Sequence, residues 1–503
     1  MNWAIAPILL PLLTAMVALL WGRTTRRRRG LVALSAVAQL GVALLLIERN
    51  LTGQAVVLGV GAWFPRVGIV LVIDLLSALM LSLSSLVALA SLLFGYAEAA
   101  VRREHPLRLP LLQFLVMGIN LSFCTGDLFN LFVAFEIMLI SSYALLTLEA
   151  DDWDVRQAYP YIAVNMIGSA LFISACGLAY GLFGTLNFAD IALRAQAMPG
   201  DPRVHALALL LLAVFGIKAG LFPLYYWLPN SYPTLPMPLA ALYSGMLTKV
   251  GVYVLLRIFG TVLPHDLHFA HQLLAWLAGV TMLLAVLGAI SRNFIRGILS
   301  FHILSQIGFM VLAIGFFTPL SFAAAIFYIT HHIVVKSSLF LIGGTAICLN
   351  RTDDLDRMGN LWSHAPWLGV LFLCQALSLA GLPPLSGFWG KYLILVVGFE
   401  LGHYPLVIAA ILASIFTLVS MLKIWNAAFW NESPAVPVRT QDPRWIRMAS
   451  VVAGLTLISL AIGFFAEPFL RIAQLAAERV LDQPGYVNLV FQHYGKGAPL
   501  PTP

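Results

Sequence analysis

Charged residues are scarce in this chain, and their scarcity limits what the protein can be. Asp, Glu, Lys and Arg make up 10% of its 503 residues, against roughly 25% in a soluble globular domain. A soluble chain of this length would divide into several domains, each with a charged outer surface. So few charges cannot cover that surface, which excludes a soluble enzyme, a disordered chain and a nucleic-acid-binding protein.

Cysteine is also rare. The chain contains four cysteines, Cys124, Cys176, Cys348 and Cys374, which lie in or beside apolar runs. Their spacing matches no metal-binding pattern, and the sequence has no Walker motif and no Gly-rich nucleotide loop after a strand. We therefore expect no metal, no cofactor and no redox centre.

Apolar residues are abundant, at 60% of the chain with a mean hydropathy of +0.91. A membrane-spanning helix needs about 20 of them, and about fourteen segments qualify. These segments are continuous rather than alternating, which excludes an outer-membrane barrel. The sequence therefore predicts an all-α polytopic protein in a lipid bilayer. The segments lie near 4–21, 31–47, 68–94, 107–125, 128–148, 160–183, 205–228, 236–258, 269–290, 296–317, 321–348, 367–399, 404–429 and 447–470.

The basic residues of the loops set the orientation, because cytoplasmic loops carry an excess of Lys and Arg. With the Arg-rich segment after the first helix inside, sixteen basic loop residues are cytoplasmic and eight are outside. This asymmetry predicts an even number of helices with both termini outside. The sixteen are Arg23, Arg26, Arg27, Arg28, Arg29, Arg102, Arg103, Arg108, Arg156, Arg292, Arg296, Arg351, Arg357, Arg439, Arg444 and Arg447, and the eight are Arg49, Arg66, Arg194, Arg203, Arg257, Arg471, Arg479 and Lys496.

Five lysines remain, and all of them fall within apolar segments: Lys218, Lys249, Lys336, Lys391 and Lys423. Lys423 is near the cytoplasmic end of its segment, where the side chain can snorkel to the headgroups. An ionisable side chain at mid-membrane costs roughly 2.5–3.5 kcal/mol and is functional by default. The other four lysines are therefore candidate residues of an ion path.

Glu136, in the middle of its segment, is the expected partner of Lys218. A nearby carboxylate keeps a buried lysine protonated, and losing that contact lets the lysine release its proton. A static buried ion pair is the alternative interpretation. Asp127 begins the same segment and is expected to cap its helix.

Histidines and one further carboxylate are accessory candidates. His332 precedes Lys336 by one helical turn and shares its face, so the two form a plausible proton relay. His331 points elsewhere and can be a structural residue, and His302 can admit protons from the cytoplasm or only support packing. Asp74 falls in the third segment, where a structural bond to a neighbouring helix and a transport role are both open.

A short motif occurs twice. Ala219-Gly-Leu-Phe-Pro-Leu recurs 161 residues later as Ala380-Gly-Leu-Pro-Pro-Leu, with five spanning segments between the copies. An odd number of segments means that the copies run in opposite directions through the membrane, as in transporters with inverted repeats and broken helices. Proline interrupts the helical hydrogen bonds, so we expect breaks near 220–229 and 381–388. Two unrelated proline kinks are the alternative.

These residues resemble a known family, the antiporter-like subunits of respiratory complex I and of Mrp-type monovalent cation/proton antiporters. The resemblance is carried by the segment around Glu136 and by Phe215-Gly-Ile-Lys-Ala-Gly-Leu-Phe-Pro-Leu-Tyr, Leu247-Thr-Lys-Val-Gly-Val-Tyr, Ser305-Gln-Ile-Gly-Phe-Met, His331-His-Ile-Val-Val-Lys and Leu382-Pro-Pro-Leu-Ser-Gly-Phe-Trp-Gly-Lys. Thr125-Gly-Asp-Leu-Phe-Asn-Leu-Phe and Ser231-Tyr-Pro-Thr-Leu-Pro are typical of the D-type branch, also called Pha or Mnh. The complex I subunit of similar length usually has Glu at the position of Lys391.

The resemblance implies a subunit of a hetero-oligomeric Mrp-type complex in the bacterial inner membrane. In that membrane, the termini that the positive loops place outside are periplasmic. It implies Glu136 and Lys218 as the first coupling pair, Lys249 as the central relay, and Lys336 and Lys391 in the second half. It also implies five-helix inverted repeats. The expected division is three helices in 1–106, the first repeat in 107–258, the second in 269–430, a fourteenth helix in 431–483 and a polar, loosely ordered tail in 484–503.

The expected function is secondary transport: a proton-translocating subunit of a Na⁺ or K⁺/H⁺ antiporter, and not an enzyme. The observation behind it is the line of buried lysines with one glutamate. The alternative is a proton-pumping membrane subunit of a redox-driven complex, of the complex I or membrane-bound hydrogenase type. A structural scaffold with degenerate charges is disfavoured by the intact set of lysines.

Overall fold

The computed structural model describes residues 3–22, 25–63, 68–99, 104–432, 438 and 440–494. Six of the basic loop residues that predict the orientation lie outside the described residues, as does the end of the expected tail, 495–503. The six are Arg23, Arg66, Arg102, Arg103, Arg439 and Lys496.

Long apolar helices make up most of the described chain. Twelve of them, counting the turns that extend α1, α10 and α17, are long and apolar enough to span a membrane, and two shorter apolar helices are α4 and α15. Each of the fourteen expected segments overlaps one of these fourteen helices. They are α1 (Ala6–Leu20), α2 (Arg26–Leu51), α3 (Leu75–Glu98), α4 (Arg108–Cys124), α5 (Leu128–Thr147), α6 (Asp152–Phe183), α8 (Pro202–Ala219), α10 (Met237–Arg257), α11 (His268–Ser291), α12 (Ile295–Phe316), α13 (Pro319–Asn350), α15 (Pro366–Ala380), α17 (Tyr404–Ile424) and α18 (Arg444–Phe464).

Shorter elements join and extend these helices. Short helices are α7 (Phe188–Gln196), α9 (Trp227–Ser231), α14 (Leu361–His364), α16 (Ser386–Glu400), α19 (Ala466–Leu481) and α20 (Gln483–Tyr494). The 3₁₀ turns are η1 (Trp3–Ile5), η2 (Val60–Ala62) and η4 (Tyr232–Thr234), and the π-helical turns η5 (Ile258–Val262) and η6 (Trp425–Trp430) end α10 and α17.

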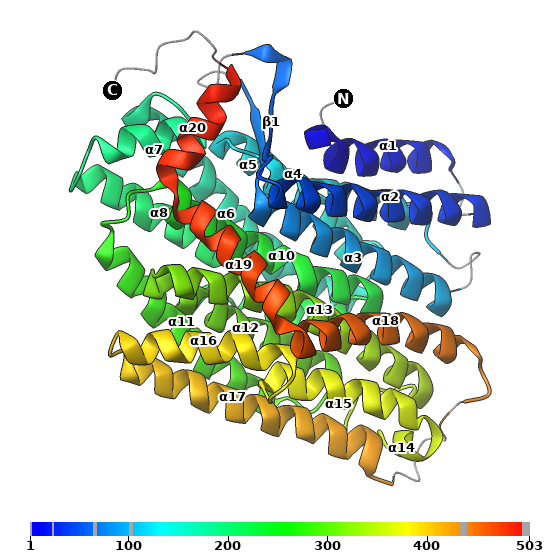
Figure 1. Cartoon of the computed structure of the whole chain (residues 1–503). Helices are drawn as coiled ribbons and strands as arrows, with labels where there is room; N and C mark the ends of the chain where they lie inside the picture. Colours follow the sequence, from blue (N-terminus) through cyan, green and yellow to red (C-terminus); the bar gives the residue numbers. More distant parts are fainter. Residues whose placement is uncertain are drawn as a thin grey trace.

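The long helices lie side by side, and α19 runs diagonally across them (Figure 1). The most apolar stretches of α10, α12 and α13 are 100%, 94% and 89% buried, against 33% for those of α2 and α6. These three helices pack against one another and form the centre of the bundle. Lys249 on α10 and Lys336 on α13 are therefore shielded from lipid by the surrounding helices.

The two expected helix breaks are present. α8 ends at Gly220 and α15 at Gly381, whose φ angles of 86° and 93° lie in the left-handed region that favours glycine. The N–H of the next residue then bonds to a carbonyl of the preceding turn in both copies, from Leu221 to Gly216 and from Leu382 to Leu377. The segment that we expected at 367–399 is therefore two helices, α15 and α16. The Phe222–Pro223 and Pro383–Pro384 peptide bonds are both cis.

A β-hairpin was not predicted from the sequence. β1 (Val56–Gly59) and β2 (Val70–Ile73) pair antiparallel, with Val56 opposite Ile73 and Gly59 opposite Val70. The third helix, expected from residue 68, begins only at Leu75. All four residues of β2 are buried, so its side chains give no alternating pattern to separate the strand from the apolar helix that follows.

The expectation of a loose tail from residue 484 was wrong as far as Tyr494. α20 continues the chain as a helix that packs against α7. Tyr486, Val487, Val490 and Phe491 are buried. These four residues are spaced as one helical face, and polar residues around them, such as Asn488 and Gln492, conceal that face in a simple reading of composition.

Candidate functional site

Glu136 and Lys218 are brought together by α5, α6 and α8, with a serine between them. The Ser169 hydroxyl donates a hydrogen bond to Glu136 Oε1 at 2.5 Å. Lys218 Nζ donates to Ser169 Oγ at 3.1 Å and to the Asn165 carbonyl at 3.0 Å. Gly168 packs closely against the helix of the lysine, because a Cβ there would lie 3.1 Å from Ile217 Cγ2. The expected pair is thus close in space, and the contact is made through a hydroxyl.

Lys249 lies on α10, whose residues are all buried. Its ammonium donates to the Ser244 carbonyl at 2.5 Å and to Thr248 Oγ1 at 3.2 Å, both on its own helix. Two residues further on, Gly251 faces the end of α8, where a Cβ would meet Ala219 N at 2.7 Å. This close approach sets the distance between the helix of Lys249 and the break beside Lys218.

Lys336 and His332 lie one turn apart in the buried middle of α13. Lys336 Nζ and both ring nitrogens of His332 have no hydrogen-bond partner among the described residues. The positive charge of Lys249 disfavours a positive charge on either His332 or Lys336. Buried polar groups need hydrogen-bond partners, so these two side chains are the least satisfied of the candidate ion path.

Lys391 occupies the second helix break. Its ammonium donates to the carbonyls of Leu379 and Ala380, both at 3.0 Å, which are the last residues of α15. It also lies 4.5 Å from the ring centroid of Phe309 on α12. The lysine therefore satisfies carbonyls that the interrupted helix leaves without their usual donors.

The other two histidines bond to serines of neighbouring helices. His302 Nε2 lies 2.6 Å from Ser420 Oγ on α17. His331 Nδ1 lies 2.7 Å from Ser386 Oγ at the start of α16, and that hydroxyl also contacts Ser378 at 2.8 Å and Ser459 at 3.3 Å. His331 is thus tied to three helices, as expected of a residue that does not share the face of Lys336.

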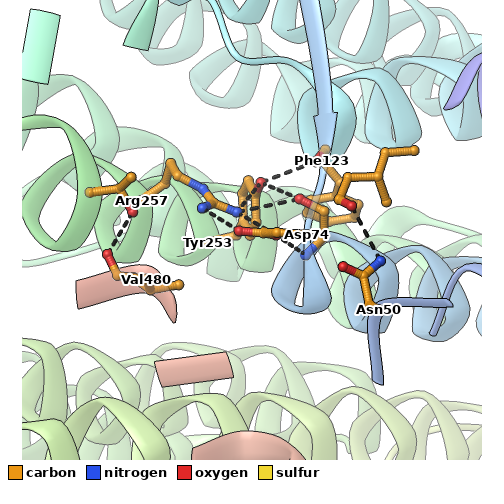
Figure 2. A network of polar contacts seen from close by, with 9 residues as sticks. Asn50, Asp74, Phe123, Tyr253, Arg257 and Val480 are labelled. Carbon is orange, nitrogen blue, oxygen red and sulfur yellow. Dashed lines mark hydrogen bonds and ion pairs between the residues drawn. The ribbon is translucent and has the colours of Figure 1, made fainter. Parts of the chain in front are cut away.

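Asp74 lies away from these lysines, in a buried ion pair with Arg257 (Figure 2). Its carboxylate caps α3 through the Ser77 N–H at 2.9 Å and accepts from Arg257 Nη1 at 2.7 Å and Nη2 at 2.9 Å. The charge pattern of the loops assigned Arg257 to an outer loop, and this was wrong. Arg257 is the last residue of α10 and 3% exposed.

Asp127 caps α5, as expected, by accepting from the Asn130 N–H at 2.7 Å. Two polar residues were missed, Ser169 between Glu136 and Lys218 and Arg257 beside Asp74. Ser169 carries no sequence signal, because neutral hydroxyls are common in membrane helices. Arg257 did have a sequence signal, because Asp74 in an apolar run needs a counter-charge from another helix and Arg257 can supply it.

Comparisons with known proteins identify the family of this chain. Residues 125–417 match the family model described as NADH:quinone oxidoreductase/Mrp antiporter, transmembrane. The chain is 38% identical over 98% of its length to the D subunit of the Na⁺/H⁺ antiporter of Alkalihalophilus pseudofirmus and 34% identical over 98% to that of Bacillus subtilis, covering 99% of each relative.

Solved structures give the same result. A chain of the Mrp complex from Dietzia superposes with a TM-score of 0.90 at 30% identity, covering 97% of this chain and 99% of that one. A chain of respiratory complex I from Thermus thermophilus superposes with a TM-score of 0.81 at 25% identity, over 95% and 99% of the two chains. The chain belongs to the NADH:quinone oxidoreductase/Mrp antiporter transmembrane family.

Proposed function

We propose that this chain is the D-type, proton-translocating subunit of a multisubunit monovalent cation (Na⁺ or K⁺)/H⁺ antiporter. The observation that carries the proposal is the linked group of Glu136, Ser169 and Lys218 at a broken helix. The relatives named as D subunits of Na⁺/H⁺ antiporters, alike over nearly the whole chain, support it.

The chemistry of the buried lysines explains how protons would move. Lysine gives up its proton when it is buried and loses a neighbouring negative charge. Lys218 has such a neighbour in Glu136. Lys249 and Lys336 are surrounded by neutral groups, and the only charge that acts on Lys336 among the described residues is the positive charge of Lys249. Proton arrival on one lysine therefore disfavours the charge on the next, which couples successive transfers along α10 and α13. His332 and Lys391 continue the path toward the second break.

The division into two repeats is also a proposal, and several local features support it. An antiparallel bridge joins Asp127 to Asn187, and another joins Phe294 to Asp354. α6 and α13 are both 32 residues long, and each ends at a residue with positive φ, Gly184 and Arg351. These features and the π-helical turns η5 and η6 recur at a constant separation of 167 positions.

We place the repeats in 107–258 and 269–430, inverted with respect to each other, in a bacterial inner membrane with both termini periplasmic. The positive loops support this orientation. The partners are the other subunits of the antiporter complex, as implied by the relatives and by the Mrp complex whose chain superposes.

Antiport in everted membrane vesicles that contain the full complex tests the function. Adding Na⁺ or K⁺ to vesicles with an acid interior should release protons in the wild type, and Glu136→Ala and Lys218→Ala should abolish this exchange while the complex still assembles. Unchanged exchange in either assembled variant would refute the assignment. Co-purification with flavin or iron–sulfur subunits would instead favour the redox-driven alternative.

A further inference from the structure

We propose that Ser169 is a further residue of the proton path, passing a proton between Lys218 and Glu136. The proposal deepens the proposed function and rests on it. Ser169 Oγ is placed to donate to the carboxylate and to accept from the ammonium at the same time, at 2.5 Å and 3.1 Å. A serine hydroxyl has one donor and two acceptor sites, so both contacts can exist together.

The transfer conserves charge and atoms. The Ser169 hydroxyl proton moves to Glu136 Oε1 as a proton from Lys218 Nζ moves to Ser169 Oγ. The O–H bond of the serine breaks and re-forms, and one N–H bond is exchanged for one O–H bond on the carboxylate. An ammonium and a carboxylate become an amine and a carboxylic acid, and the serine is unchanged. Because both hops occur together, no alkoxide is formed.

The position of Ser169 in the fold is a second observation. Ser169 is the eighteenth residue of α6, and Lys336 is the eighteenth residue of α13, two helices of 32 residues. Their separation of 167 positions is that of the bridges and positive-φ residues described above. The residue that links Glu136 to Lys218 in one half of the chain therefore occupies the place of a buried lysine in the other half.

The surroundings of Ser169 explain why a bridging group is needed. Its neighbours Met166 and Ile167, on the same helix, are 61% and 59% exposed in the isolated chain, so the outer face of α6 is apolar. A carboxylate and an ammonium next to such a face have few other polar partners, and unpaired ions there are costly. The hydroxyl keeps the two ions connected without direct contact.

Ser169→Ala tests the proposal in everted vesicles of the full complex, with Ser169→Thr to restore the hydroxyl. Ser174→Ala is the matched control, because Ser174 is on the same helix, is exposed, and bonds only to the Ala170 carbonyl among the described contacts. We expect antiport to fall by about 100-fold in Ser169→Ala, the range for loss of a proton-transfer group. Ser169→Thr and Ser174→Ala should stay close to the wild type.

The pH profile separates a proton-transfer role from a structural one. Removing the hydroxyl takes a donor from Glu136 and an acceptor from Lys218, so the pH optimum of the residual antiport should shift. A structural serine would lower the amount of assembled complex and leave the optimum in place. Full activity of assembled Ser169→Ala beside an inactive Glu136→Ala would overturn this proposal alone. Absence of antiport in the wild type would overturn the proposed function and this proposal with it.

Discussion

The ammonium group of Lys391 lies 3.0 Å from the carbonyl of Leu379, the residue that takes the position of Lys218 in the second copy of the repeated motif. Lys218 precedes its helix break in the sequence, and Lys391 follows the other one and folds back to it. Both breaks therefore hold a buried ammonium group, although the lysine comes from a different helix each time. A buried ammonium needs acceptors. The end of α15 supplies them to Lys391, whereas Lys218 finds them on α6.

This relationship predicts the effect of moving the second lysine. Lys391→Leu should lower antiport by about 100-fold or more, because a proton-transfer group is lost. Adding Leu379→Lys to that variant should restore part of the rate, since the new ammonium would start from the position that Lys218 occupies at the first break. The measurement is the initial rate of cation-driven proton release in vesicles.

Lys423→Leu is the matched control for Lys391→Leu. Lys423 lies near the end of α17 and, like Lys391, donates only to backbone carbonyls in the described contacts, those of Ile290 and Arg292 at 3.2 Å and 2.7 Å. Its loss should leave antiport near the wild-type rate. Equal losses in the two variants would show that any lysine within these helices is needed for structure rather than for proton transfer.

The buried pair of Asp74 and Arg257 predicts a stability effect. Arg257→Leu leaves a buried carboxylate without its counter-charge, which should destabilise the folded protein by about 3–5 kcal/mol. Adding Asp74→Asn removes that charge and keeps an N-cap acceptor for Ser77, so the double variant should recover much of the loss. Thermal unfolding in detergent measures both. A double variant less stable than Arg257→Leu would contradict this account, and antiport in the double variant would show whether Asp74 also takes part in transport.

The buried lysines, Glu136 and the two breaks were predictable because each is conspicuous in the sequence. A charge in an apolar run and a Gly-x-x-Pro pair within an expected helix both depart from their surroundings. Ser169 does not, since its role exists only after α5, α6 and α8 have packed together. The charged residues of the proposed path can be predicted from local sequence. The neutral residue between two of them, Ser169, can be identified only once the packing of the helices is known.

Arg257 and the hairpin show a different limit. Arg257 ends an apolar run, where a basic residue usually marks a loop, and only the packing of α10 against α3 buries it. The strand β2 is as apolar as the helix that follows, so local composition cannot separate them. In both cases the decisive contact joins segments distant in the sequence.

The close approach of Gly251 to Ala219 predicts that a single methyl group disturbs transport. Gly251→Ala would place a Cβ 2.7 Å from Ala219 N, so α10 must shift away from the break at a cost of about 1–3 kcal/mol. That shift moves Lys249 relative to Lys218, and antiport should fall more than the amount of assembled complex does. Gly177→Ala, with open space around its Cβ, should change neither. Normal antiport in Gly251→Ala would show that this spacing tolerates change.

The last helix predicts that the C-terminal segment is part of the folded protein. The Gln483 amide donates to the Leu263 carbonyl at 2.5 Å and accepts from Gln196 at 2.7 Å, so it joins the loop after η5 to α7. Tyr486 and Val490 are buried in the same region, and each such side chain contributes about 1.5–3 kcal/mol by burial. Deleting residues 483–503 should therefore lower the thermal stability of the protein markedly, whereas deleting 495–503 keeps α20 and should leave it near the wild-type value. Equal stability of the two truncated chains would mean that α20 adds nothing to the fold, and that Arg257, whose guanidinium lies over the Tyr486 ring, is held without it by Asp74, Ser77 and Tyr253.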